Sequence, residues 1–185
     1  MKGLALAVIA ALISGCAGIQ SSTRVDSQIK AFEFNSLASQ YMQRPTHSSI
    51  ETMSTGSSVL LLEMDKYGTG TSQIRFDKAH VESYVALIDK FKAWESLAKA
   101  RQDALTKEIG RARTWSNIGT GELKFVFHSG NQNSHYLAIS FCTVGTCLDD
   151  QALYLDLPNA NRLTLTLQQL ESGQLKHTNV DAIYK

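Results

Sequence analysis

The residues best suited to acid–base chemistry gather between positions 128 and 150. His128 and His135 flank a short polar stretch, SGNQNS, and the adjacent Asp149 and Asp150 follow a few residues later. Histidine and aspartate are common general acids and bases. One hypothesis is therefore an enzyme, such as a hydrolase, that uses His128, His135, Asp149 and Asp150. The alternative is that these polar side chains lie at strand ends and turns, where they are solvated.

Two cysteines lie in the same region, within the sequence FCTVGTC. Cys142 and Cys147 are separated by four residues, and Gly145 helps the chain to turn between them. The two can then face each other across a hairpin and form a disulfide. Closing so small a loop stabilises a fold by about 2 kcal/mol on the chain-entropy model. We predict a local structural disulfide.

Two other interpretations of these cysteines fit the sequence less well. A redox site would normally use the spacing C-x-x-C, which lowers the pKa of the attacking thiol. A metal site would combine Cys142 and Cys147 with His128 and His135, but no standard ligand spacing is present. We therefore predict no metal.

Signatures of other enzyme classes are absent from the sequence. It contains no G-x-S-x-G and no H-E-x-x-H motif, and no glycine-rich phosphate loop precedes a helix. The glycines of YGTGTS lie between two expected strands, where a turn explains them. We predict no catalytic residue and no cofactor, and we favour a non-enzymatic role.

The third cysteine, Cys16, ends the longest apolar run of the chain. Lys2 precedes an apolar stretch from Leu4 to Ile13, and Ser14 and Gly15 are small. This layout is typical of a secretory signal. A membrane-spanning helix needs about 20 apolar residues, and this run is too short because Gln20 and two serines follow it.

The four residues Ile13-Ser14-Gly15-Cys16 resemble the lipobox of bacterial lipoproteins. The resemblance implies that residues 1–15 are a signal peptide, that cleavage occurs before Cys16, and that Cys16 carries lipid. Ala17 after the cysteine, in place of an aspartate, implies transfer to the outer membrane, with the protein anchored on its periplasmic face. Export to this oxidising compartment favours a disulfide between Cys142 and Cys147. The alternative is an ordinary cleaved signal with an incidental cysteine.

Charge and length limit the partners of the exported part. Without Lys2, its Lys and Arg residues balance its 17 Asp and Glu residues, so no net positive charge recruits nucleic acid. We expect residues 16–24 to be a lipidated tether and residues 25–185 to be a single globular domain. The expected partners are the membrane, through the lipid, and an envelope protein or the cell wall.

Hydrophobic spacing predicts the elements of the first half. We expect a helix over residues 25–42, a Ser- and Thr-rich loop over 44–58, and a hairpin with strands at 58–64 and 73–76. Asp77 should cap a long amphipathic helix that runs to Glu108. Its expected buried stripe consists of Val81, Tyr84, Val85, Ile88, Phe91, Trp94, Ala98 and Leu105.

In the second half we expect a breaker region over residues 110–121 and a final helix over 159–170. Three strands are expected between them, at 122–128, 135–141 and 152–157. The predicted class is α+β, with antiparallel hairpins and both helices on one face of the sheet.

The segments QIRFDKAHVESYVALIDKF and ALYLDLPNANRLTLTLQQL align without gaps at an offset of 79 residues. A duplicated strand-strand-helix unit would produce this pattern. Any strand followed by a cap and an amphipathic helix would also produce it.

Two functions of different classes follow from the sequence. The first is a lipid-anchored envelope lipoprotein with a binding or structural role. The second is a periplasmic enzyme such as a hydrolase, with its site around His128, His135, Asp149 and Asp150. A pocket with convergent polar groups favours the enzyme, whereas an exposed apolar surface favours binding.

Overall fold

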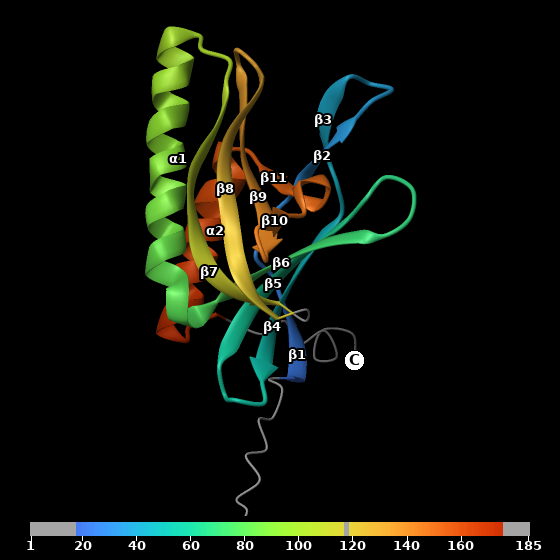
Figure 1. Cartoon of the computed structure of the whole chain (residues 1–185), viewed down its shortest axis with the longest axis vertical. Helices are drawn as coiled ribbons and strands as arrows, with labels where there is room; N and C mark the ends of the chain where they lie inside the picture. The colour runs from blue at the N-terminus through green and yellow to red at the C-terminus, as the bar shows by residue number, and fades with distance from the viewer. Residues whose placement is uncertain (1–17, 117–118, 176–185) are drawn as a thin grey trace, which may run out of the picture.

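Antiparallel strands make up about half of the computed structural model, which describes residues 18–116 and 119–175 (Figure 1). Sheet A has the order β1-β4-β5-β6, with β1 at Ile19–Val25, β4 at Thr46–Met53, β5 at Ser58–Asp65 and β6 at Thr71–Asp77. Sheet B has the order β3-β2-β11-β9-β8-β7. Its strands are β2 (Phe32–Asn35), β3 (Gln40–Gln43), β7 (Thr106–Ser116), β8 (Gly119–Asn131), β9 (Ser134–Thr143) and β11 (Leu153–Leu155), and the short β10 (Thr146–Cys147) pairs with β9. The α+β prediction is confirmed, although the fold is mostly β.

Helices α1 (Val81–Arg101) and α2 (Leu157–Ser172) pack against each other and against sheet B. Side chains alternate along a strand, and the register of β8 and β9 places Phe125 opposite Ile139 and Phe127 opposite Leu137. These four side chains are buried in one core with the apolar residues of both helices. Sheet A contributes Leu60, Leu62, Met64, Ile74 and Phe76 to the same core.

Helix α1 begins later and ends earlier than the sequence pattern indicated. Asp77 caps a short 3₁₀ turn, Lys78–His80, because its carboxylate accepts a hydrogen bond from the backbone N–H of Ala79. The helix ends where Gln102 adopts a left-handed conformation with φ of 57°. Leu105 is therefore not part of the helical stripe. Val81, Tyr84, Ile88, Phe91 and Ala98 are buried as predicted, whereas Val85 and Trp94 are only partly buried.

The helix predicted over residues 25–42 is wrong. The segment contains the end of β1 and the hairpin formed by β2 and β3. Side chains of Asp26 and Asn35 accept hydrogen bonds from backbone N–H groups two or three residues ahead. Such local bonds compete with helix formation. The left-handed backbone of Gln28 and Ser39 completes the two turns.

Two segments predicted to be irregular are strands. The loop expected over residues 44–58 contains β4, whose hydroxyl groups find partners: Thr46 accepts from the N–H of Ala31, and Ser48 bonds to Ser27. The breaker region expected over 110–121 contains the end of β7 and the start of β8. Gly110 sits at a bulge in β7, where an added Cβ would lie 2.7 Å from Leu87 Cδ2 on α1. This glycine permits close packing of the helix and does not end the strand.

The predicted strands at 58–64, 73–76, 122–128 and 135–141 lie within β5, β6, β8 and β9, and the predicted helix at 159–170 lies within α2. The strand expected at 152–157 is confirmed only over β11. Asp156 caps α2 by accepting from the N–H of Asn159, just as Asp77 caps the turn before α1. Both segments of the internal alignment thus run from a strand through a capping aspartate into a helix.

The N-terminal segment expected to be a tether, residues 16–24, is part of the sheet from Ile19 onward. Strand β1 pairs with β4 from Ile19 opposite Met53 to Val25 opposite Ser48, with one bulge between Ile19 and Ser21. The predicted signal peptide and Cys16 lie outside the described residues.

Candidate functional site

The face of sheet B that the helices leave uncovered carries aromatic and charged side chains. Residues that alternate with the core positions of β8 and β9 point to this open face: Lys124, Val126 and His128 on β8, and Tyr136, Ala138 and Ser140 on β9. Strand β11 adds Tyr154, which lies opposite Ala138 on one side and Phe32 on the other. The open face is therefore assembled from segments far apart in the sequence.

Six rings on the open face form one contact network, which we call the aromatic cluster. Its members are Phe32, Phe34, Tyr41, His128, Tyr136 and Tyr154. Tyr41 lies at its centre, with ring centroids 4.6 Å from Tyr136 and 4.8 Å from Tyr154. Phe34, at the edge of the cluster, is 51% exposed. The cluster thus packs the β2–β3 hairpin onto the sheet and also presents an apolar edge to solvent.

His128 is held at both ring nitrogens. Nε2 lies 2.7 Å from the hydroxyl oxygen of Tyr41, and Nδ1 lies 2.9 Å from Oγ1 of Thr106. Burial lowers the pKa of His128 because a charged imidazole loses hydration there. Burial likewise raises the pKa of Tyr41, with Tyr154 and Tyr136 adding to the effect. His128 and Tyr41 are therefore both uncharged at neutral pH. Their hydrogen bond holds the imidazole in place within the aromatic cluster.

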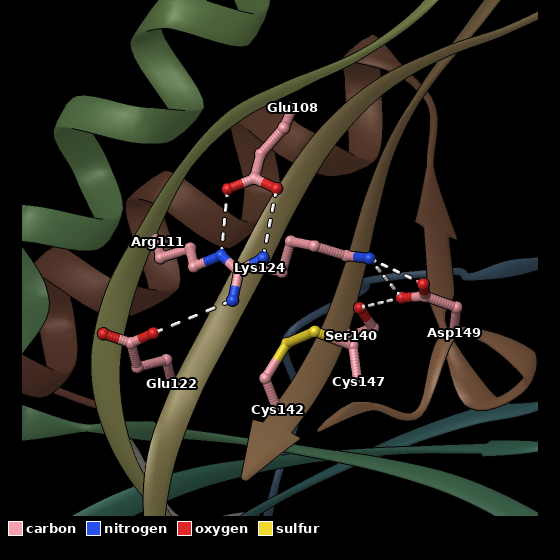
Figure 2. The surroundings of a disulfide bond; sticks show 8 residues. All are labelled: Glu108, Arg111, Glu122, Lys124, Ser140, Cys142, Cys147 and Asp149. Atoms are coloured by element: carbon pink, nitrogen blue, oxygen red, sulfur yellow. Dashed lines mark hydrogen bonds and ion pairs between the residues drawn. A yellow bond between two sulfur atoms is a disulfide. The ribbon is translucent and has the colours of Figure 1, made fainter. Parts of the chain in front are cut away.

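Next to the aromatic cluster lies a row of ion pairs across β7, β8 and the turn after β10 (Figure 2). Arg111 binds both carboxylate oxygens of Glu108, at 2.9 and 3.2 Å, and its other nitrogen lies 4.0 Å from Glu122. Lys124 Nζ lies 2.6 Å from the carboxylate of Asp149. These five residues form what we call the charge row.

Two carboxylates of the charge row, those of Glu108 and Asp149, have lowered pKa values. The hydrogen bond from Arg111 lowers the pKa of Glu108, and the hydrogen bond from Lys124 lowers the pKa of Asp149. Ser140 also donates a hydrogen bond to Asp149, at 2.7 Å. Acceptors that are both charged and already paired are poor proton carriers. The charge row therefore offers a polar surface with fixed charges for binding.

A groove of about 360 Å³ runs between the charge row and the aromatic cluster. Its walls include Glu108, Lys124 and Asp149 on one side and His128 and Tyr154 on the other, with Val126 and Ala138 between them. Polar and apolar groups that converge on one hollow are the usual composition of a binding site. This groove is the candidate functional site.

The structure separates the two histidines of the enzyme hypothesis. His135 lies opposite Ser129, so it points to the helix-covered face, where its Nδ1 lies 3.0 Å from Ser129 Oγ. Its Nε2 is buried and meets no hydrogen-bond partner among the described residues. His128 points to the open face. The two residues cannot act on one substrate atom.

Ser140, His128 and Asp149 all line the groove, but they do not form a catalytic triad. Ser140 lies opposite Lys124 in the ladder, four residues from His128, which corresponds to about 13 Å along the strand. The hydroxyl of Ser140 donates to Asp149, and neither nitrogen of His128 bonds to it. Asp150 is exposed and does not line the groove. No group of three His, Cys, Asp or Glu residues placed to hold a metal occurs within residues 18–116 and 119–175.

The predicted disulfide partners lie directly opposite each other. Cys142 on β9 pairs with Cys147 on β10, and their sulfur atoms are 2.00 Å apart (Figure 2). The bridge closes the turn of Val144 and Gly145, which both have positive φ. From this turn the chain returns along β9 and places Asp149 beside Lys124. The disulfide thus supports one wall of the groove.

Sequence reasoning missed most of the groove. The rings of Tyr41, Tyr136 and Tyr154 were not recognised as a group, nor was Lys124 as the partner of Asp149. Period-two alternation of large and polar residues in HYLAIS and KFVFH was the available signal. It assigns Tyr136 and Lys124 to the second face of their strands.

Comparison with known proteins gives no relative on which to base a function: no protein-family model, curated protein or solved structure matches the chain. Among the described residues, neither helix has the length and apolar character needed to cross a membrane.

Proposed function

We propose that this chain is a lipid-anchored lipoprotein of the bacterial envelope, held on the periplasmic face of the outer membrane, and that its domain binds a partner. The residues Ile13-Ser14-Gly15-Cys16 support the anchor, and the open face of sheet B supports binding. The partner is an envelope protein or the cell wall. A disulfide between Cys142 and Cys147 is consistent with an oxidising compartment.

One observation carries the binding role: both helices cover one face of sheet B, while the other face keeps a groove between aromatic and charged side chains. A sheet face that served only packing would be covered or would carry isolated polar residues. Here Phe34 is half exposed at the edge of the aromatic cluster. Aromatic rings beside fixed hydrogen-bonding groups are the anchors that protein and sugar ligands use.

The likeness of the two strand–aspartate–helix segments supports a further part of the proposal, a duplicated strand-strand-helix unit. Asp77 caps the 3₁₀ turn before α1 and Asp156 caps α2, at positions that the alignment of the two halves makes equivalent. The two helices then pack side by side on one sheet face.

Photo-crosslinking in intact cells tests the binding role. A photoreactive residue replaces Val126 in the groove, and the matched control places it at Leu165, which is 60% exposed on α2. We expect a shifted adduct from position 126 and none from position 165. An adduct that a muramidase shortens identifies the cell wall, whereas an adduct that only a protease removes identifies a protein.

A second pair of variants separates binding from folding. Phe34→Ala removes an exposed ring of the aromatic cluster, and Leu37→Ala removes a side chain that is 97% exposed on the same hairpin. Phe34→Ala should weaken the adduct from position 126 while Leu37→Ala leaves it unchanged. Equal adducts from positions 126 and 165, or no effect of Phe34→Ala, would exclude the groove as the binding site.

A further inference from the structure

The described chain leaves very little free length before the sheet begins. Strand β1 starts at Ile19, and Gly18 is already bound to the β4–β5 turn: its N–H donates to Ser54 Oγ, and its carbonyl accepts from the N–H of Ser54. Three Cα–Cα steps separate Cys16 from Ile19, which is at most about 11 Å. A tether over residues 17–24 would have reached about 25 Å.

The two segments that meet at this attachment point are uncharged, although Asp77, Arg113 and Glu122 line a hollow beside the β4–β5 turn. Residues 18–23 and 52–62 contain no Asp, Glu, Lys or Arg. Ser54, Thr55, Gly56 and Ser57 are exposed at the turn, and Ile19 is 41% exposed beside them. Bacterial bilayers expose anionic headgroups, which repel carboxylates. An uncharged, hydroxyl-rich turn with an exposed isoleucine can lie against such a surface without that cost.

The opposite end of the molecule carries the β2–β3 hairpin. Figure 1 shows the start of β1 and the β4–β5 turn together at one end, and the tip of the β2–β3 hairpin projecting toward the other. Leu37 at that tip is almost fully exposed. The aromatic cluster, which includes Phe34 and Tyr41 of this hairpin, is therefore displaced from the attachment point.

We propose that the β4–β5 turn and the start of β1 form a membrane-contact surface, which fixes the domain upright on the lipid and directs the β2–β3 hairpin away from it. This inference rests on the proposed lipid anchor at Cys16, because the short distance from Cys16 to β1 supplies the constraint. The occupant of the surface is the lipid headgroup layer. The orientation presents the aromatic cluster to partners in the periplasm.

Fluorescence quenching on vesicles tests the orientation. The full lipidated chain carries a single introduced thiol, Thr55→Cys at the β4–β5 turn or Leu37→Cys at the β2–β3 turn, labelled with a maleimide dye. Both positions are exposed turns, and the other cysteines are occupied by the disulfide and the lipid. The vesicles contain phosphatidylethanolamine and phosphatidylglycerol with a nitroxide-labelled headgroup.

We expect the dye at position 55 to be quenched about twofold or more beyond the dye at position 37, because only the former lies within reach of the short tether. Inserting 20 Gly and Ser residues between Ala17 and Gly18 gives a flexible link of about 25 Å. The insertion should remove the difference while the protein still floats with the vesicles.

The outcomes distinguish the orientation from the anchor. Equal quenching at positions 55 and 37 in protein that floats and contains palmitate would overturn the orientation and leave the anchor standing. Stronger quenching at position 37 would reverse the orientation. Protein without palmitate that fails to float would instead remove the proposed anchor itself.

Discussion

Phe91 and Trp94 on α1 provide a matched test of how the helix covers sheet B. Phe91 is fully buried, and its ring lies 5.8 Å from that of Phe127. Phe91→Ala removes a core ring and leaves a cavity, which costs about 3–5 kcal/mol. For a domain of this size each kcal/mol lowers the melting temperature by about 2–4 °C, so we expect a decrease of about 6–20 °C.

Trp94, one turn further along, is only partly buried. Its ring lies beside Phe127 and under the ammonium groups of Lys90 and Lys107, at 5.1 and 5.4 Å from the ring centroid. Partial burial and exposed cation–π contacts are worth less than full burial. Trp94→Ala should therefore cost about 1–2 kcal/mol, clearly less than Phe91→Ala.

Urea denaturation followed by circular dichroism measures both free energies of unfolding. The slope of the free energy against urea concentration should stay unchanged, since neither variant alters the surface exposed on unfolding by much. Equal losses for Phe91→Ala and Trp94→Ala, or a loss below about 1 kcal/mol for Phe91→Ala, would refute the assigned packing of α1.

Two further predictions concern the disulfide and the histidines. Replacing both Cys142 and Cys147 by Ala should lower the free energy of unfolding by about 2 kcal/mol while the far-UV spectrum is retained, and mass spectrometry of the unreduced protein should show no free thiol at these positions; two free thiols would contradict the bridge. Burial lowers the pKa of His128 and His135 below the ordinary value of 6.5, so below pH 6.5 the unfolded chain takes up protons that the folded protein does not. Stability should therefore be unaffected by these groups above pH 6.5 and should fall as the pH drops below it; an NMR titration in which either imidazole becomes protonated above pH 6.5 would contradict this.

Segments whose conformation depends on their own residues were predicted correctly. Segments whose conformation depends on partners elsewhere in the chain were not. The hairpin of β5 and β6 and the two helices were predicted because their hydrophobic patterns, and the aspartates just before the helical segments, are local. The β2–β3 segment was misread because Ile29, Phe32 and Tyr41 happen to fall at helical spacing, whereas the Asx turns at Asp26 and Asn35 decide its conformation. Strand β4 was missed because its Ser and Thr residues resemble a loop until β1 and β5 supply its partners.

The candidate groove could not be predicted for a related reason. His128 and His135 were grouped because they are close in sequence, but an odd separation across a tight hairpin places them on opposite faces. Tyr41 and His128 are 87 residues apart and meet only because β2 joins sheet B through β11. Asp149 was singled out as a candidate acid–base residue, but its partner Lys124 follows only from the ladder of β8 and β9 and from the bridged turn beyond it.

Lipid labelling of Cys16 tests the central claim most directly. Cells that express the full chain are grown with labelled palmitate and their membranes are separated, with Cys16→Ser as the comparison. The lipid anchor predicts that the native chain is labelled and fractionates with the outer membrane, and that Cys16→Ser is unlabelled and is lost from it. Palmitate on the Cys16→Ser variant, or a native chain that is unlabelled, would contradict the proposed anchor.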